Sequence, residues 1–253
     1  MSVLTVERLG KTYSGFQAVS DVSFALEAGE MLALIGPNGA GKSTCFNMIN
    51  GQLAPTRGRV SIFGRRADGM RPRQIWRLGV GRTFQIPATF ASMTVAENVQ
   101  TALLSHRRRR WPALGWAARL HLDEAARLLE LVGMADQAER SCGELAYGDL
   151  KRLELALALP NDPKLLLMDE PAAGMAPSER RALMTLTVRL ARQRTIGVLF
   201  TEHDMDVVFG YADRVLVLNR GMLIAVGAPS AVRASAEVQA VYLGAGALYG
   251  ARP

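Results

Sequence analysis

The chain has 253 residues, of which 49% are hydrophobic and 21% are charged, and its formal net charge is +7. This composition indicates a globular protein of one or two domains and excludes a disordered chain. Two cysteines, Cys45 and Cys142, are too few for a disulfide framework, and no apolar run is long enough to span a membrane. The first residues lack the basic start and apolar stretch of a signal peptide, so we expect a cytosolic protein.

The first third of the chain is predicted to form strands around a glycine-rich loop. Leu4–Leu9 and Val22–Leu26 alternate between apolar and polar residues, as half-buried strands do. Met31–Ile35 is a continuous apolar run and therefore predicts a buried strand. A helix is expected over Lys42–Asn50, and residues 58–62 predict a further strand that ends before the turn at Gly64.

The middle of the chain, from about residue 87 to 159, lacks strand patterns and predicts a helical insertion. Strands follow after it, and their alternation with helices indicates an α/β fold with a mostly parallel sheet. The predicted helices cover 95–105, 122–132, 149–159, a segment beginning at Ser178 as N-cap, and 237–243. The predicted strands cover 165–168, 196–200, 215–218 and 222–226, the last two joined by a turn at 219–221.

The glycine-rich loop fits the phosphate-binding pattern G-x-x-x-x-G-K-[ST] in full, between a predicted strand and a predicted helix. Glycines allow successive backbone N–H groups to surround a polyphosphate, and the helix N-terminus adds partial positive charge. Lys42 is expected to reach the terminal phosphates, and the Ser43 hydroxyl to ligate Mg²⁺. The nucleotide-binding residues predicted here are Gly36, Pro37, Asn38, Gly39, Ala40, Gly41, Lys42, Ser43 and Thr44.

Two acidic residues, Asp169 and Glu170, directly follow the apolar strand at 165–168. In ATPases with such a loop, an Asp at a strand end holds Mg²⁺, and the next acidic residue can polarise the attacking water. Asp169 is therefore a predicted metal-binding residue, and Glu170 a predicted catalytic residue.

Positive charge is concentrated between residues 57 and 110, which contain twelve arginines but two acidic residues, Asp68 and Glu97. This block has a balance of +10, so the rest of the chain is slightly acidic. Its peak, Arg107–Arg110, is consistent with a solvated loop, with contact to phospholipid headgroups or with nucleic-acid binding. The lack of interleaved aromatic residues argues against nucleic acid.

Taken together, these motifs resemble the ATP-binding-cassette (ABC) family, the nucleotide-binding subunits of ABC transporters, over nearly the whole chain. Gln85, in Arg82-Thr83-Phe84-Gln85, matches the glutamine loop of the family. The sequence Leu145-Ala146-Tyr147-Gly148-Asp149 matches the signature motif, usually written LSGGQ. His203 matches the switch histidine, and Ala173–Pro177 fits the D-loop. Five motifs in the order of the family are far more specific than any one of them.

The resemblance implies a role for each matched residue. Tyr13 would stack on the adenine, and Gln85 would contact Mg²⁺ and the nucleophilic water and link to the membrane partner. His203 would contact the γ-phosphate, and Glu170 would act as the catalytic base. The signature residues Leu145, Ala146, Tyr147, Gly148 and Asp149 would contact ATP held by a second ATPase subunit.

The resemblance also implies a fold: a RecA-like P-loop NTPase core, an N-terminal antiparallel β subdomain and a helical insertion. The whole chain, 1–253, would be one ABC ATPase domain. Residues 1–86 and 160–253 would form the nucleotide-binding core, and 87–159 the helical signature subdomain.

The sequence departs from the family pattern at the signature and at the D-loop. Ala146 replaces the signature serine, which removes a hydroxyl donor to the γ-phosphate, and Asp149-Leu150 differs from the common form with glutamine. The D-loop lacks its usual aspartate. These changes affect the site that this subunit would complete for its partner, and leave its own Lys42, Asp169, Glu170 and His203 intact.

Longer stretches such as GVGRTFQIPATFASMTVAENV and TEHDMDVVFGYADRVLVLNRG resemble the larger ATPase of branched-chain and hydrophobic amino-acid uptake systems. That implies two membrane permeases, a second ATPase subunit, as a homodimer or a heterodimer, and indirectly a periplasmic or extracellular binding protein. The subunit would lie peripherally on the cytoplasmic face of the inner membrane, with ATP and Mg²⁺ as cofactors.

Other functions remain open from the sequence. Related importers carry urea, short amides or aromatic acids, and no residue of this chain would contact the transported substrate. An ABC ATPase of nucleic-acid metabolism would fit the basic block, but the tandem cassettes, coiled coils and zinc-binding cysteines of those proteins are absent, so we expect no nucleic-acid partner. A P-loop kinase or transferase would explain the lysine loop, though not the signature or His203.

Overall fold

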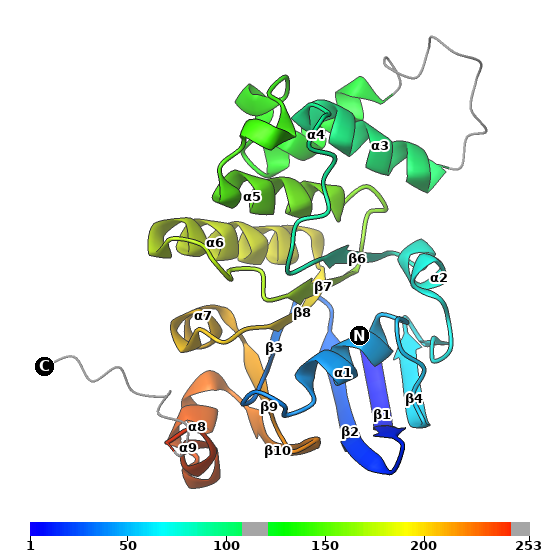
Figure 1. The fold of residues 1–253 in the computed structure, drawn as a ribbon, viewed down its shortest axis with the longest axis vertical. Helices are drawn as coiled ribbons and strands as arrows, with labels where there is room; N and C mark the ends of the chain where they lie inside the picture. The colour runs from blue at the N-terminus through cyan, green and yellow to red at the C-terminus, as the bar shows by residue number, and fades with distance from the viewer. Residues whose placement is uncertain (108–120, 244–253) are drawn as a thin grey trace, which may run out of the picture.

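The computed structural model describes residues 1–107 and 121–243. These residues contain two β-sheets, with a cluster of helices at one end of the longest axis and the N-terminal sheet toward the other (Figure 1). The α/β fold predicted from the sequence, with a parallel sheet and an N-terminal antiparallel sheet, is confirmed.

The N-terminal sheet is antiparallel, with strand order β2-β1-β4-β5. Its strands are β1 (Ser2–Tyr13), β2 (Phe16–Glu27), β4 (Arg57–Ile62) and β5 (Arg65–Arg66). A tight turn joins β1 to β2 at Ser14 and Gly15, both of which have positive φ. The predicted strand Leu4–Leu9 lies within β1, and Val22–Leu26 lies in the second half of β2. Both strands are longer than predicted, and their pairing continues past irregularities.

The core sheet has the order β10-β9-β3-β8-β7-β6, and all its strands except β10 run parallel to their neighbours. The carboxyl ends of its parallel strands therefore lie at one edge, where ligands bind in open α/β sheets. Its strands are β3 (Met31–Ile35), β6 (Val80–Thr83), β7 (Leu165–Asp169), β8 (Gly197–Thr201), β9 (Arg214–Asn219) and β10 (Met222–Gly227).

The core sheet is buried on both faces, which explains why Met31–Ile35 is apolar at every position. Met31, Ala33 and Ile35 belong to an apolar cluster that includes the helices. Leu32 and Leu34 face the other way, into a cluster formed with the N-terminal sheet and with α1 (Lys42–Ile49).

Three long helices occupy the segment between β6 and β7: α3 (Val95–Arg107), α4 (Leu122–Leu131) and α5 (Tyr147–Leu157). They form the green cluster at one end of Figure 1, and α6 (Pro177–Arg194) lies between that cluster and the rest of the molecule. The remaining helices are α2 (Pro72–Arg77), α7 (Met205–Tyr211), α8 (Pro229–Ala234) and α9 (Ala236–Leu243). Among the residues described, no helix combines the length and apolar character needed to cross a bilayer.

Two predicted helix starts are wrong. The helix predicted from Ser178 is α6, whose N-cap is Ala176; Pro177 takes the first helical position, and Glu179 accepts a hydrogen bond from the Ala176 N–H. Helix α5 begins at Tyr147, two residues before the predicted start. Strand β6 and helices α2, α7 and α8 were not predicted. The arginines at 108–110 and the closing Gly244 lie outside the described residues.

Candidate functional site

The glycine-rich loop follows β3 and leads into α1. Gly41, the N-cap of α1, has a φ of 98°, and a Cβ at this position would lie 2.6 Å from the carbonyl oxygen of Ala18. A Cβ on Gly36 would overlap the carbonyl of Leu218. Two glycines of the motif are therefore required by the backbone path and by close approach of neighbouring strands.

The loop is held in place by the turn between β9 and β10. The Gly221 N–H donates to the carbonyl oxygen of Ala40 at 2.9 Å, and the Gly221 carbonyl accepts from the Ser20 N–H at 2.7 Å. The loop borders a cavity of about 420 Å³. The cavity is lined by Tyr13, Phe16, Ala18, Asn38, Gly39, Ala40, Gly41, Lys42, Ser43, Thr44, Glu170 and His203.

Lys42 is 8% exposed, and its ammonium donates to the carbonyl oxygens of Gly36 at 2.6 Å and Pro37 at 3.1 Å. Burial lowers the pKa of Lys42, and the nearby carboxylates of Glu170 and Asp169 oppose that shift. The structure therefore places the predicted lysine and the predicted carboxylates within electrostatic reach of one another.

Glu170 is contacted by two other predicted catalytic residues. Its Oε1 lies 2.5 Å from Nε2 of His203, and its Oε2 accepts a hydrogen bond from Nε2 of Gln85 at 2.8 Å. Glu170 also has a φ of 48°, a left-handed conformation that is uncommon for a residue with a side chain. Strained backbone of this kind concentrates at functional sites, where the surroundings hold it in place.

Thr201 and Glu202, at the end of β8, were missed in the sequence. The Thr201 hydroxyl donates to Oδ1 of Asp169 at 2.7 Å and accepts from the Glu170 N–H at 3.1 Å. The buried Glu202 carboxylate accepts from the N–H groups of Ala172 and His203, and burial raises its pKa. The one sequence feature that could have identified Thr201 and Glu202 is their position directly before His203.

Two aromatic residues flank the cavity at the turn between β1 and β2. Tyr13, predicted from the sequence, is 44% exposed, and Phe16, which was not predicted, is 69% exposed. The two residues pair across the hairpin. They offer apolar ring surface beside the glycine-rich loop, as binding of a flat heterocycle requires.

The signature residues do not line this cavity. Leu145 to Asp149 lie at the start of α5, where Tyr147 Oη donates to the Gln85 carbonyl at 3.5 Å. A Cβ on Gly148 would lie 2.8 Å from Oε1 of Glu179, and one on Gly174 of the D-loop 3.3 Å from the Tyr147 ring. Within one chain, the signature therefore meets the D-loop and the glutamine loop, not the phosphate-binding loop.

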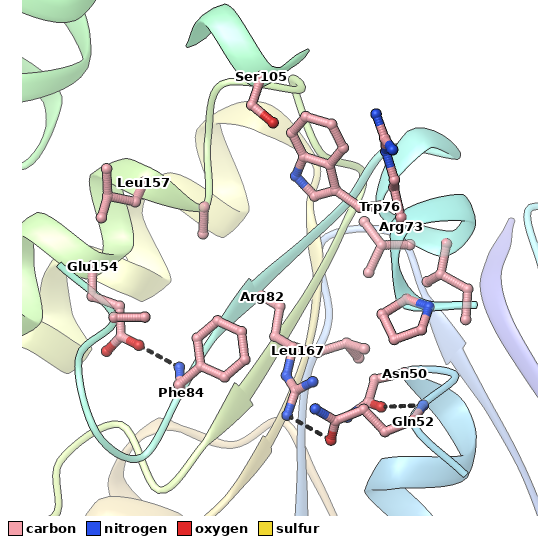
Figure 2. A pocket seen from close by; sticks show the side chains of 15 residues that line it. Asn50, Gln52, Arg73, Trp76, Arg82, Phe84, Ser105, Glu154, Leu157 and Leu167 are labelled. Carbon is pink, nitrogen blue, oxygen red and sulfur yellow. Dashed lines mark hydrogen bonds between the residues drawn. The ribbon is translucent and has the colours of Figure 1, made fainter. Parts of the chain in front are cut away.

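A second cavity, of about 440 Å³, lies where the chain leaves β6 (Figure 2). Arg82 stacks on Phe84 there, with 4.4 Å between its guanidinium carbon and the ring centre, and donates to Gln52 at 3.3 Å. The Phe84 N–H donates to the carboxylate of Glu154, as the dashed line in Figure 2 shows. Burial raises the pKa of Glu154, and Lys151 opposes the shift.

The residues predicted to hold Mg²⁺ offer oxygen donors, which that ion prefers. They are the hydroxyl of Ser43, the carboxylate of Asp169 and the amide of Gln85. In the part of the chain that the structure describes, no three His, Cys, Asp or Glu side chains form a metal-binding group. One carboxylate and two neutral oxygen donors suit Mg²⁺ that is also bound by the phosphate oxygens of a nucleotide.

Comparison with known proteins agrees with this geometry. Residues 19–173 match the ABC transporter family. The chain is 40% identical over 250 residues to the high-affinity branched-chain amino acid transport ATP-binding protein LivG of Salmonella typhimurium, covering 96% of this chain and 98% of LivG. It is 37% identical over 249 residues to the corresponding protein BraF of Pseudomonas aeruginosa, with coverage of 96% and 98%.

A solved ATP-binding cassette of an ABC transporter, in its ADP conformation, superposes with a TM-score of 0.85 at 32% identity. The match covers 96% of this chain and 99% of that structure. The family resemblance expected from the sequence motifs is thus confirmed by fold and by sequence. The chain belongs to the ABC transporter family, as an ATP-binding cassette that binds nucleotide and acts as an ATPase.

Proposed function

We propose that this chain powers an importer for branched-chain or related amino acids by hydrolysing ATP at the cytoplasmic face of the membrane. The observation that carries the proposal is the joining of Gln85, Glu170 and His203 beside the phosphate-binding loop, in a chain similar to LivG and BraF over nearly their whole length. The transported substrate is inferred from those relatives. Urea, amides and aromatic acids are the alternatives, since the substrate passes through other subunits.

In the proposed mechanism, Glu170 polarises the attacking water, and its two neighbours orient the carboxylate. His203 contacts one carboxylate oxygen and Gln85 the other, which fixes the plane of the group. Lys42 and the loop amides hold the phosphates and offset the charge that develops on them. Ser43, Asp169 and Gln85 would hold Mg²⁺, which adds charge neutralisation when bound.

Two copies of such a cassette, identical or paired with a second ATPase, would close around ATP. The separation of the signature from the loop cavity in one chain supports an arrangement in which Leu145–Asp149 serve the partner's nucleotide. Anion binding at the start of α5 would use the helix N-terminus. Ala146 contributes no hydroxyl to that contact.

We assign residues 1–86 and 160–253 to the nucleotide-binding core and 87–159 to a helical signature subdomain. Closure and reopening of the dimer would move this subdomain and, through the loop at Gln85, the two permeases. The basic block of residues 57–110 would face the permeases and the anionic membrane surface. The support for this placement is the concentration of twelve arginines against two acidic residues in that segment.

The proposal is tested by uptake in cells that lack the gene. Loss of labelled leucine, isoleucine and valine uptake, restored by the wild-type gene and not by Glu170→Gln, is the expected result. Normal uptake of these amino acids together with loss of urea, amide or benzoate uptake would move the assignment to one of the alternatives. Co-purification with two permeases is expected from detergent-solubilised membranes.

A further inference from the structure

Helix α5 contains a buried pair of opposite charges, Lys151 and Glu154. The two residues are 2% and 3% exposed, and Nζ of Lys151 lies 3.3 Å from Oε2 of Glu154. Removing two charges from water is costly, and an apolar pair of similar volume often stabilises a protein at least as well. The helix alone therefore does not explain why two charges are buried here, and the contacts of the pair outside the helix become relevant.

Both charges bind the backbone at the end of β6. The Lys151 ammonium donates to the carbonyl oxygens of Phe84 at 2.9 Å and of Gln85 at 2.8 Å. With Glu154, these acceptors use all three of its donors. The Glu154 carboxylate accepts from the Phe84 N–H (Figure 2). The Lys151 ammonium thus binds backbone carbonyl groups, and the Glu154 carboxylate binds a backbone N–H. The charges of the two side chains are complementary to the polar groups of the Phe84–Gln85 backbone.

The backbone held in this way carries a side chain of the proposed active site. Gln85 donates to Glu170, 85 residues along the chain. The clasping residues lie on the helix that starts at the signature, and Tyr147, one turn before Lys151, also reaches the Gln85 carbonyl. One helix therefore connects the signature to the residue that touches the proposed base.

We propose that Lys151 and Glu154, here called the α5 clasp, are positioning residues that fix Gln85 against Glu170 by holding the backbone of Phe84 and Gln85. The proposal deepens the proposed function and rests on it for the role of Glu170. Any displacement of α5 moves the Phe84–Gln85 backbone with it. Contact of the signature with a partner's nucleotide is thereby transmitted to the water-polarising carboxylate of the same chain.

Three variants separate this role from simple stabilisation of the helix. Lys151→Arg keeps the donors, so its kcat should stay within about threefold of wild type. Lys151→Met/Glu154→Leu removes the clasp without leaving an unpaired buried charge. Lys151→Glu/Glu154→Lys keeps the ion pair within the helix, but turns a carboxylate toward the carbonyls of Phe84 and Gln85.

Both the apolar and the reversed variants should lower kcat for ATP by at least about tenfold, because misplacement of a positioning group near 1 Å costs on the order of 100-fold. The Kd for ATP should change by less than twofold, because Lys42 and the loop are untouched. A matched control, Lys164→Met/Glu130→Leu, changes two exposed side chains of the same types and should match wild type.

Hydrogen exchange of the full chain provides a readout independent of hydrolysis. In wild type, the Phe84 amide should exchange far more slowly than the Ala88 amide, and this protection should be lost in the apolar and reversed variants. Folded clasp variants with wild-type kcat and wild-type exchange would overturn the proposal. If the clasp variants do not fold, rapid exchange of the Phe84 amide in wild type would overturn it by itself. Normal hydrolysis by Glu170→Gln would reject the proposed function while leaving the exchange result to judge the clasp.

Discussion

Nε2 of His203 lies 2.5 Å from Oε1 of Glu170, although the two residues end different strand–loop segments of the core sheet. The other oxygen of the same carboxylate is held by Gln85, from the end of a third strand. A single acidic side chain is thus oriented from both sides by residues that the sequence separates by 85 and 33 positions.

Replacing Glu170 by Gln should abolish most ATP hydrolysis and preserve nucleotide binding. Gln cannot take up a proton, and a positioned general base contributes about 10²- to 10⁴-fold to a rate. We expect kcat to fall by at least about 100-fold, measured by phosphate release, with the Kd for ATP within threefold of wild type. Glu139→Gln, at an exposed position, is the control. An unchanged kcat would exclude Glu170 as the base.

Nucleotide affinity should depend on pH through Lys42. Burial lowers the pKa of this lysine, and only its protonated form attracts phosphate. ATP binding is therefore coupled to proton uptake, and affinity should fall as pH rises, beginning below the ordinary lysine value of 10.5. Lys42→Met should weaken binding by about 10- to 100-fold, since a hydrogen bond to a charged group contributes about 1.5–3 kcal/mol. In calorimetric titrations the variant should lose the decline of affinity with rising pH that wild type shows. A slope equal to that of wild type would contradict the assignment.

Gly41→Ala should distort the phosphate-binding loop, because the added Cβ meets the Ala18 carbonyl and φ is 98°. A strained residue of this kind costs about 1–3 kcal/mol, so the urea midpoint should fall and ATP binding should weaken. Gly210→Ala is the matched change, since a Cβ there meets nothing within 4 Å and the position is helical. It should stabilise the protein by about 0.5–1 kcal/mol. Equal midpoints for the two variants would contradict the geometric argument.

Neutralising the four arginines Arg107–Arg110 to Gln should weaken binding to vesicles that contain anionic lipid. Each basic residue near such a surface contributes about 1 kcal/mol, and the effect should diminish as salt is added. Nucleotide affinity should not change. Neutralising Arg181 and Arg189, which are exposed on α6 and lie outside the basic block, is the control. Unchanged vesicle binding would exclude a membrane contact of Arg107–Arg110 and favour their interpretation as a solvated loop.

The sequence was sufficient for the elements whose patterns are local. Met31–Ile35 and 165–168 are continuous apolar runs, and the loop between Gly36 and Thr44 has fixed spacing, so β3, β7 and the phosphate-binding loop were predicted at their observed places. Strand β6 was missed because only Val80 among Val80-Gly81-Arg82-Thr83 has an apolar side chain. The strand is specified by its pairing with β7, which no local sequence pattern reports.

The functional site likewise combines residues that local motifs predict with residues that only the fold brings together. Motif spacing predicted Lys42, Glu170 and His203, but the positions of Thr201 and Phe16 depend on which strand ends and hairpins meet in three dimensions. Lys151 and Glu154 were not singled out in the sequence. Their burial follows from the packing of α5 on the end of β6, a contact between segments 67 residues apart.

The position of β6 in the core sheet has a mechanical consequence. Among the described residues, β6 pairs with β7 alone, whereas β3, β7 and β8 are each hydrogen-bonded on both sides. Displacing a border strand breaks one ladder, and displacing an interior strand breaks two. The phosphate-binding loop and Asp169-Glu170 therefore follow interior strands paired on both sides, whereas the segment that leads to Gln85 follows a border strand paired on one side. A displacement of helices α3, α4 and α5 should therefore shift β6 before it shifts the phosphate-binding loop.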